Sequence, residues 1–326
     1  MSSCIDDAFQ HGHWLHVQGI HDGSTLLSRN EQLGSLGCSH WEYANSSCGP
    51  AMSETRLCRA LRCQSVLMVG DSTFSRLFAA LIPFGKPLPS MSQEMLCPIA
   101  EAGAKRAVMR QARTICTAEC PHGGINVSYW RHNHLLAEGL QLSSVEKHES
   151  CDAWLDQHIL AAHPILIISS GAHLMAYDEA TQRRNASWHA ARADALANHL
   201  QQATTGKVIF VHAHWGAKHW SATEATPISA PERPHPSFGW DLLPMVSTAL
   251  ATRLRQRLGD RLLVIDPTRA LAQRPDCRES HMHVRSEVYL ASTWRMLQNA
   301  LHHAFVPGRR LHASDRYLVL EKQAHT

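Results

Sequence analysis

The chain has 326 residues, 44% of them hydrophobic and 18% charged, so it is long enough to bury a sizeable core in one large domain. Its 31 Lys and Arg residues nearly balance 28 Asp and Glu residues, and the basic side chains are scattered, which does not favour nucleic acid as a partner. No apolar run reaches about 18 residues, so we expect no membrane span in this chain, and its first residues lack the pattern of a signal peptide.

Residues 1–64 form the first predicted region, a cysteine-rich N-terminal segment. The chain has ten cysteines, of which five lie in this segment: Cys4, Cys38, Cys48, Cys58 and Cys63. Such density favours disulfide bridges in an oxidising compartment, with buried reduced cysteines as the alternative, and the sequence does not give the pairing. Cys58 and Cys63, taken with Cys116 and Cys120, lack the usual spacing of a zinc site, so we expect no metal.

Three glycosylation sequons also favour the secretory route, although such tripeptides arise by chance as well. They begin at Asn45, Asn126 and Asn185. We therefore expect a protein of the Golgi lumen or the extracellular space, with its signal or anchor outside this chain.

An apolar strand over residues 66–69 runs into Gly70-Asp71-Ser72, and apolar residues then recur at helical spacing over residues 74–81. A helix therefore begins within a residue or two of Ser72. In one interpretation Asp71 or Ser72 caps this helix. In the other, Gly70 lets the chain turn sharply and Ser72 is an exposed nucleophile, whose reaction is helped by the N–H groups at the helix start. The two interpretations are compatible.

This strand opens the second predicted region, residues 65–305, in which short apolar strands alternate with helical patterns. That alternation is typical of a parallel sheet with crossover helices, so we predict a three-layer α/β/α domain. The third region, residues 306–326, is a C-terminal extension. Further strands are expected at residues 126–130, 165–168, 208–211 and 262–265, and helices at 186–202, 243–258 and 287–305.

A loop before the last predicted helix holds the groups that an activated serine needs. It follows the strand at residues 262–265 and contains two acids, Asp276 and Glu279, and two histidines, His281 and His283. A histidine takes the proton of the serine hydroxyl and an acid orients that histidine. The carboxyl ends of parallel strands are where open α/β folds bind their ligands, so Ser72 and this loop are expected to meet there.

With a serine block early in the domain and an acid and a histidine together in a late loop, the chain resembles the SGNH (GDSL) hydrolase superfamily. It further resembles the PC-esterase group, which includes the plant trichome birefringence-like polysaccharide O-acetyltransferases. The likeness covers roughly residues 38–305 and is most specific at Gly70-Asp71-Ser72. The other matching residues are Trp41, Cys48 and Cys58 ahead of the serine block, the segment ILIISSGAHL at 165–174, and Asp276-Cys277, His281 or His283, and Trp294.

The resemblance implies that Ser72 is the nucleophile and that His283, or else His281, is the base. His283 is preferred because it lies nearer to the family's spacing from Trp294. The family's acid lies three residues before its histidine, whereas those positions here are Ser280 and Arg278, so Asp276 or Glu279 would orient the base.

The resemblance also implies a set of oxyanion and substrate residues. Where the family has an asparagine donor, this chain has Ser169-Ser170-Gly171, so the donor would be a hydroxyl, a backbone N–H or absent. The other expected members of the set are Gly70, Asp71, His173 and Arg131. Each of the last two is about as well explained as a hydrogen-bonded residue of the core or rim.

We therefore expect an acyl esterase or O-acetyltransferase that acts on carbohydrate through an acyl-serine intermediate, with no cofactor. Its partners would be a carbohydrate substrate and an acyl donor. Ester cleavage and acetyl transfer share the covalent step, so the sequence does not separate them. A non-catalytic carbohydrate-binding protein with a decayed site is the main alternative, and a non-catalytic lumenal scaffold is a third interpretation.

Overall fold

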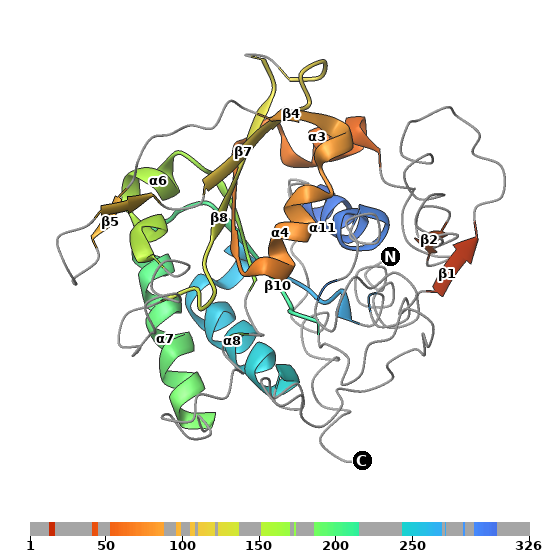
Figure 1. The fold of residues 1–326 in the computed structure, drawn as a ribbon. Coiled ribbons are helices and arrows are strands. Elements are labelled where there is room, and N and C mark those ends of the chain that lie inside the picture. Colours follow the sequence, from red (N-terminus) through yellow and green to blue (C-terminus); the bar gives the residue numbers. More distant parts are fainter. Residues whose placement is uncertain are drawn as a thin grey trace.

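A computed structural model gives the structure of the chain (Figure 1). It describes residues 13–16, 41–44, 53–87, 96–98, 105–107, 110–120, 123–136, 151–169, 173, 186–214, 243–268, 271, 283 and 290–304.

The described residues build a seven-stranded sheet in the order β11-β10-β9-β3-β8-β7-β4. Its first five strands are parallel, and β7 and β4 add an antiparallel edge. The predicted α/β class with a central parallel sheet is confirmed. The strands span Val66–Gly70 (β3), Gly85–Pro87 (β4), Arg110–Ile115 (β7), Ile125–Arg131 (β8), Ile165–Ile168 (β9), Lys207–Val211 (β10) and Leu262–Ile265 (β11).

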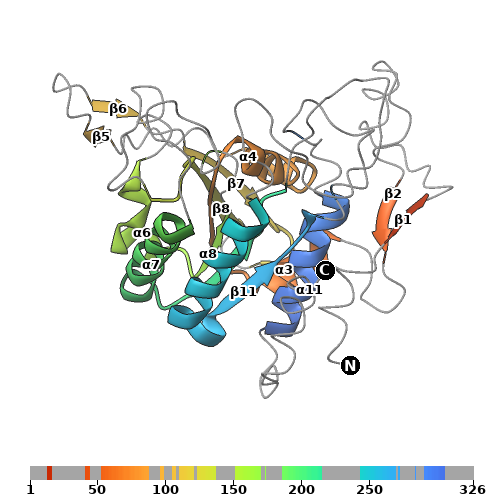
Figure 2. The same cartoon turned by 90° about the horizontal axis from the view of Figure 1, so that it is seen from below.

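Helices cover both faces of the sheet, so the domain has three layers (Figures 1 and 2). On one face lie α3 (Glu54–Leu61), α4 (Ser72–Ala79) and α11 (Arg295–Ala304). On the other lie α6 (Gln157–Ala161), α7 (Ala186–Ala203) and α8 (Leu243–Leu258).

Successive side chains of a strand point to opposite faces of the sheet, so they belong to two separate hydrophobic clusters. In β3, Val66 and Met68 belong to the cluster under α3, α4 and α11, whereas Leu67 and Val69 belong to the cluster under α6, α7 and α8. All four side chains are fully buried. This burial on both faces explains why the parallel strands are continuous apolar runs in the sequence.

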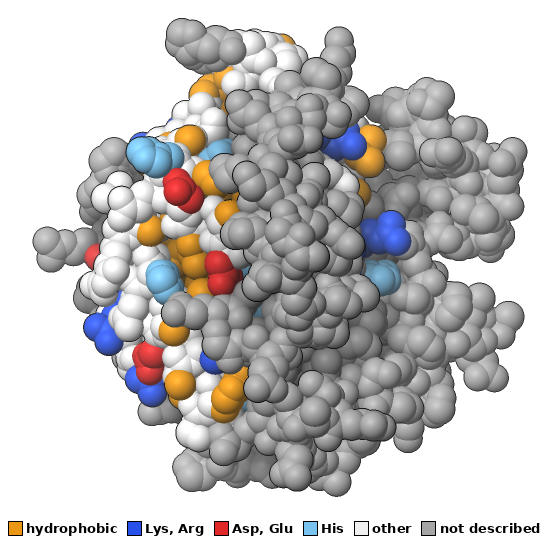
Figure 3. Space-filling view, turned by 60° about the vertical axis from the view of Figure 1, so that its left-hand side comes forward, with side chains coloured by type: hydrophobic (Ala, Val, Ile, Leu, Met, Phe, Trp, Pro, Cys, Tyr) orange, Lys and Arg blue, Asp and Glu red, His pale blue; other side chains and the backbone are white. Residues whose placement is uncertain are grey.

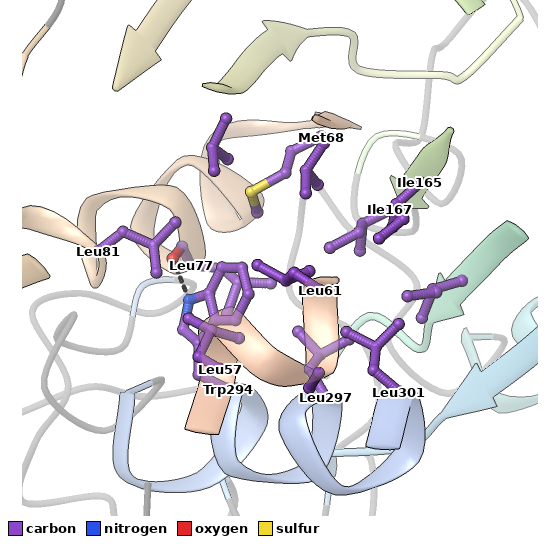
Figure 4. Packing of buried hydrophobic residues seen from close by; sticks show 14 of the residues in the cluster. Leu57, Leu61, Met68, Leu77, Leu81, Ile165, Ile167, Trp294, Leu297 and Leu301 are labelled. Atoms are coloured by element: carbon purple, nitrogen blue, oxygen red, sulfur yellow. Dashed lines mark hydrogen bonds between the residues drawn. The ribbon is translucent and has the colours of Figure 1, made fainter. Parts of the chain in front are cut away.

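A buried tryptophan contacts all three helices of the layer formed by α3, α4 and α11 (Figure 4). Trp294 is the last residue of the π-helical turn Leu290–Trp294 that precedes α11, and its side chain is fully buried. It packs in one cluster with Leu57 of α3 and Leu297 of α11. Its indole Nε1–H donates to the carbonyl oxygen of Leu77 in α4 at 2.7 Å, so the end of the domain is bonded to the helix that begins at Ser72.

Two disulfides connect α3 and the turn that follows it to the segment between β7 and β8. Cys58 is bonded to Cys116, and Cys63 to Cys120, across 58 and 57 residues of sequence. Cys151 is also disulfide-bonded. The bridges of Cys58 and Cys63 therefore run from the cysteine-rich segment to the sheet and do not join these two cysteines to each other.

One of the three sequons lies inside the sheet. Asn126 and Ser128 are in β8, between β3 and β7, and Ser128 is fully buried. This tripeptide is thus not accessible to glycosylation in the folded chain. Asn45 and Asn185 lie outside the described residues.

The described residues also form two short antiparallel pairs of strands outside the main sheet, and 3-10 helices at Ile82–Phe84, Asp152–Leu155 and Gly259–Arg261. The first strand pair joins β1 (His13–His16) with β2 (Trp41–Ala44), and the second joins β5 (Leu96–Pro98) with β6 (Lys105–Ala107).

The disulfide pattern predicts a specific peptide map for protein made in a secretory host. Trypsin without reduction should leave residues 57–59, 63–76 and 114–131 as one linked species, because Cys116 and Cys120 share a tryptic peptide. Further cleavage after Glu119 should separate two pairs, 57–59 with 114–119 and 63–76 with 120–131. A linked species of 57–59 and 63–76 alone would contradict the structure. Loss of one such bridge typically costs ~2–4 kcal/mol of stability.

Candidate active site

Ser72 lies where the topology of the sheet reverses. Of the parallel strands, β8 is the next along the chain after β3 and lies on one side of it. The following strand, β9, lies on the other side of β3, and β10 and β11 continue the sheet beyond β9. This is the flavodoxin-like order, in which a crevice opens at the carboxyl ends of the two strands beside the switch point. Those strands are β3, which leads into Asp71 and Ser72, and β9, which leads into Ser169. Topology alone thus favours a site at Ser72.

Asp71, and not Ser72, caps α4. The Asp71 carboxylate oxygen Oδ1 accepts from the backbone N–H groups of Thr73 at 2.9 Å and Phe74 at 3.3 Å, and from the Thr73 hydroxyl at 2.5 Å. The backbone carbonyl of Asp71 accepts from the N–H of Ser75 at 3.1 Å. Asp71 is 1% exposed, so these bonds are shielded from water. The hydroxyl of Ser72 is therefore not used as a cap.

Three of the first four N–H groups of α4 are consumed in this way, and the fourth belongs to Ser72. Within the described part of the chain, no group accepts a hydrogen bond from the Ser72 N–H. The start of a helix favours negative charge because its N–H groups are unpaired and its dipole is positive there. The unpaired Ser72 N–H is thus a donor for an anion that forms at Ser72.

Gly70 is required by close packing at the turn. A β-carbon built on Gly70 would lie 2.6 to 2.7 Å from the Cδ1, Cβ and Cγ atoms of Phe74. Phe74 is 3% exposed and cannot move away without disturbing the core. Gly70 therefore allows the first turn of α4 to fold back directly over the end of β3.

His283 meets Ser72 from the far end of the sequence. Its imidazole Nε2 lies 3.0 Å from the Ser72 hydroxyl oxygen, across 211 residues of sequence, and both residues are partly exposed. This distance is that of a hydrogen bond from a hydroxyl to a base. His281, Asp276 and Glu279 lie outside the described residues, so which acid orients His283 stays a prediction.

The other expected site residues gather at the same edge of the sheet. The N–H of Ser169 donates to the Val69 carbonyl at 3.0 Å, which leaves the Ser169 hydroxyl as its donor toward a ligand. Arg131 ends β8 opposite Gly70 and is partly exposed. His173 is partly exposed, and its ring lies 6.0 Å from that of His134. Gly171 lies outside the described residues.

A buried His–Asp pair just after β8 was not predicted from the sequence. His132 follows β8; its N–H donates to the Gly70 carbonyl at 2.8 Å, and its side chain is fully buried. Its Nδ1 accepts from the N–H of His134 at 3.2 Å, so Nε2 carries the proton and donates to Asp152 at 2.9 Å. The only signal in the sequence was a histidine directly after a strand.

The environment of His132 favours its neutral form. Burial lowers the pKa of His132 below its ordinary value of 6.5, and the nearby Asp152 carboxylate offsets this only in part. The pKa of His212, directly after β10, is lowered by burial as well and is raised in part by Asp266. Protonation of His132 at Nδ1 would also break the bond from His134.

One group of potential metal ligands occurs among the described residues. A carboxylate oxygen of Glu54 and the sulfurs of Cys58 and Cys116 lie within 4.8 Å of one another. Both sulfurs belong to a disulfide, and a metal binds the thiolate form. The bridged residues therefore do not fit a metal ion.

On the face shown in Figure 3, the acidic and basic side chains of the described residues are scattered among uncharged ones and form no patch of one sign. In the same part of the chain, no helix is both long and apolar enough to cross a bilayer.

The pKa of His132 predicts a pH-dependent stability. The unfolded chain binds a proton at His132 below about pH 6.5, whereas the folded chain resists it, so stability falls as pH decreases through that value. When the pH falls from 7.5 to 5.5, His132 should lower the free energy of unfolding by at most about 1.4 kcal/mol. In urea unfolding, the free energy of unfolding of His132→Gln should decrease less than that of the wild type over this pH range. An equal or larger loss in the variant would contradict the assignment.

Comparisons with known proteins give little beyond this geometry. No family model matches the chain, and no curated protein sequence matches it. A solved structure of a peptidoglycan O-acetylesterase is similar, at 13% sequence identity and a TM-score of 0.43. The match covers 80% of this chain and 97% of that one.

Proposed function

We propose that the protein is a serine-dependent acyl esterase or O-acetyltransferase of the SGNH type, acting on acylated carbohydrate. The observation that carries the proposal is the 3.0 Å contact between the Ser72 hydroxyl and His283 Nε2. A serine hydroxyl is a weak nucleophile until a neighbouring base removes its proton. His283 is such a base, and Ser72 is partly exposed just after the carboxyl end of β3.

In the first half of the reaction, the Ser72 hydroxyl oxygen attacks the carbonyl carbon of the ester while its proton passes to His283 Nε2. The carbonyl oxygen becomes an oxyanion, which accepts a hydrogen bond from the N–H of Ser72 at the start of α4. The bond to the sugar oxygen then breaks, and that oxygen takes the proton from His283. An acylated Ser72 and a free sugar hydroxyl remain.

In the second half, His283 removes a proton from the molecule that attacks the acyl carbon. The bond between that carbon and the Ser72 oxygen then breaks, and the Ser72 oxygen takes the proton from His283. If this molecule is water, a carboxylic acid is released and the protein is an esterase. If it is the hydroxyl of a second sugar, the acyl group is transferred. Both outcomes use the same two residues, so they differ only in which acceptor reaches the acyl-serine.

Several supporting roles belong to the proposal. Asp276 or Glu279 would hold the Nδ1–H of His283 and stabilise the imidazolium. The Ser169 hydroxyl and the Gly171 N–H would assist the oxyanion. These roles rest on the resemblance to the PC-esterase and trichome birefringence-like group, as does the carbohydrate substrate.

Two partly exposed side chains would contact the substrate near Ser72. Arg131 donates from five N–H groups, and His173 donates or accepts through either ring nitrogen. Both chemistries suit sugar hydroxyls and ester carbonyls. The proposal also places the protein in the secretory pathway, which the disulfides Cys58–Cys116 and Cys63–Cys120 support because cytosolic thiols are kept reduced.

A fluorophosphonate probe distinguishes an activated serine from a decayed site. We expect stoichiometric labelling of the purified protein at Ser72 and loss of labelling in Ser72→Ala. The matched control is Ser75→Ala, because Ser75 lies in the same turn but its hydroxyl donates to the Ser72 carbonyl at 2.6 Å and does not face a base. Absence of labelling in wild-type protein would instead favour the non-catalytic carbohydrate-binding protein.

Turnover of an activated acetyl ester should identify the base. His283→Ala should reduce kcat nearly as far as Ser72→Ala does, because a nucleophile and its base act as a unit. His281→Ala should retain most of the activity, and Asp276→Asn and Glu279→Gln should separate the two candidate acids. If both histidine variants keep the wild-type rate, the contact between Ser72 and His283 is not catalytic.

A further inference from the structure

We infer that Tyr129 is a positioning residue that holds the Ser72 peptide in the orientation needed for the oxyanion. This inference rests on the proposed function. It starts from the backbone between Gly70 and Ser72, where the chain leaves β3 and enters α4.

Tyr129 lies in the middle of β8, directly opposite Met68 of β3, and is 1% exposed. Its ring stacks against Phe78 of α4, with centroids 5.6 Å apart and planes inclined by 23°. The ring is thus fixed between the sheet and the helix that begins at Ser72. A side chain held in this way delivers its hydroxyl to a defined place.

The Tyr129 hydroxyl bonds both carbonyl groups of the turn. Its oxygen lies 2.7 Å from the carbonyl oxygen of Asp71 and 3.0 Å from that of Gly70. The Gly70 carbonyl also accepts from the N–H of His132 at 2.8 Å, and the Asp71 carbonyl from that of Ser75 at 3.1 Å. Each carbonyl therefore has one backbone donor, and the single tyrosine hydroxyl reaches both.

The bond to Asp71 controls the direction of the Ser72 N–H. Because the peptide unit is planar and trans, the C=O of Asp71 and the N–H of Ser72 point in opposite directions. Holding this carbonyl toward Tyr129, beneath α4, turns the Ser72 N–H away from the interior. The same peptide sets the position of the Ser72 Cα, and hence of the hydroxyl that meets His283.

Removal of the hydroxyl should therefore affect the transition state more than substrate binding. An oxyanion hydrogen bond forms only when the carbonyl oxygen gains charge, so misalignment of its donor lowers kcat without an equal change in KM. A purely structural role would lower stability and leave the rate of folded protein unchanged.

The test compares Tyr129→Phe with Thr204→Val. Tyr129→Phe retains the ring and its stacking on Phe78. Thr204 is a matched control, because it is 5% exposed and its hydroxyl oxygen also bonds a backbone group, the N–H of Gly206 at 3.0 Å. Thr204 precedes β10 and thus lies at the amino ends of the parallel strands, whereas Ser72 lies at their carboxyl ends. Both changes remove one buried hydroxyl, so both should lower the stability of the fold to a similar extent.

Hydrolysis of p-nitrophenyl acetate and the rate of phosphonylation by the fluorophosphonate probe are the readouts. For Tyr129→Phe we expect kcat and the phosphonylation rate to fall at least tenfold, with KM within twofold of the wild type and Ser72 still the labelled residue. For Thr204→Val we expect wild-type rates. Equal rates in Tyr129→Phe and Thr204→Val would overturn the inference, as would a change in KM alone. Inactive, unlabelled wild-type protein would contradict the proposed function itself and is thereby distinguished from these outcomes.

Discussion

The capping of α4 by Asp71 is the interaction on which the chemistry at Ser72 depends. A helix begins with four N–H groups that its own backbone cannot satisfy. Here one carboxylate oxygen of Asp71 accepts from two of them, the N–H groups of Thr73 and Phe74, and the Asp71 carbonyl accepts the first regular helical bond, from Ser75. Because Asp71 serves as the cap, the adjacent serine keeps both its hydroxyl and its N–H for a ligand. A buried acid before the serine is thus a condition for the serine to be available.

A second constraint is that the nucleophile and the base come from opposite ends of the domain. His283 reaches Ser72 across 211 residues, and the turn Leu290–Trp294, which leads from His283 toward α11, is bonded to α4. The indole of Trp294 donates to Leu77, and Ser53, the cap of α3, donates its N–H to the Gln298 side chain of α11 at 3.2 Å. The disulfides attach α3 to the strands β7 and β8. The cysteine-rich segment therefore helps to fix the helix that follows the histidine loop.

The sequence predicted those parts of the fold whose signals are local. The buried parallel strands are apolar on both faces, so their runs were recognised within one residue of their ends. By contrast, β7 was missed because Gln111, Ala112, Arg113 and Thr114 are exposed or only partly buried and form no apolar run. The helix α3 was missed because it is short and lies in a segment that was interpreted as loops and bridges.

The candidate site was predictable only in part, for the same reason. Ser72 was identified from a strand, a glycine and a helix that are adjacent in sequence, and His283 from a resemblance in spacing. The Tyr129 hydroxyl and the His132–Asp152 pair act through tertiary contacts, over 58 to 59 residues to the turn in one case and 20 residues in the other. Nothing in the local sequence of β8 distinguishes a tyrosine that bonds the turn from one that fills the core.

A crystal structure of the protein inactivated with a fluorophosphonate tests the central claim most directly, because the tetrahedral phosphorus imitates the charged intermediate. The account predicts a bond from phosphorus to the Ser72 hydroxyl oxygen, the phosphoryl oxygen within hydrogen-bond distance of the Ser72 N–H, and His283 Nε2 still beside that serine. A phosphoryl oxygen directed away from the Ser72 N–H, or an adduct on another residue, would contradict it.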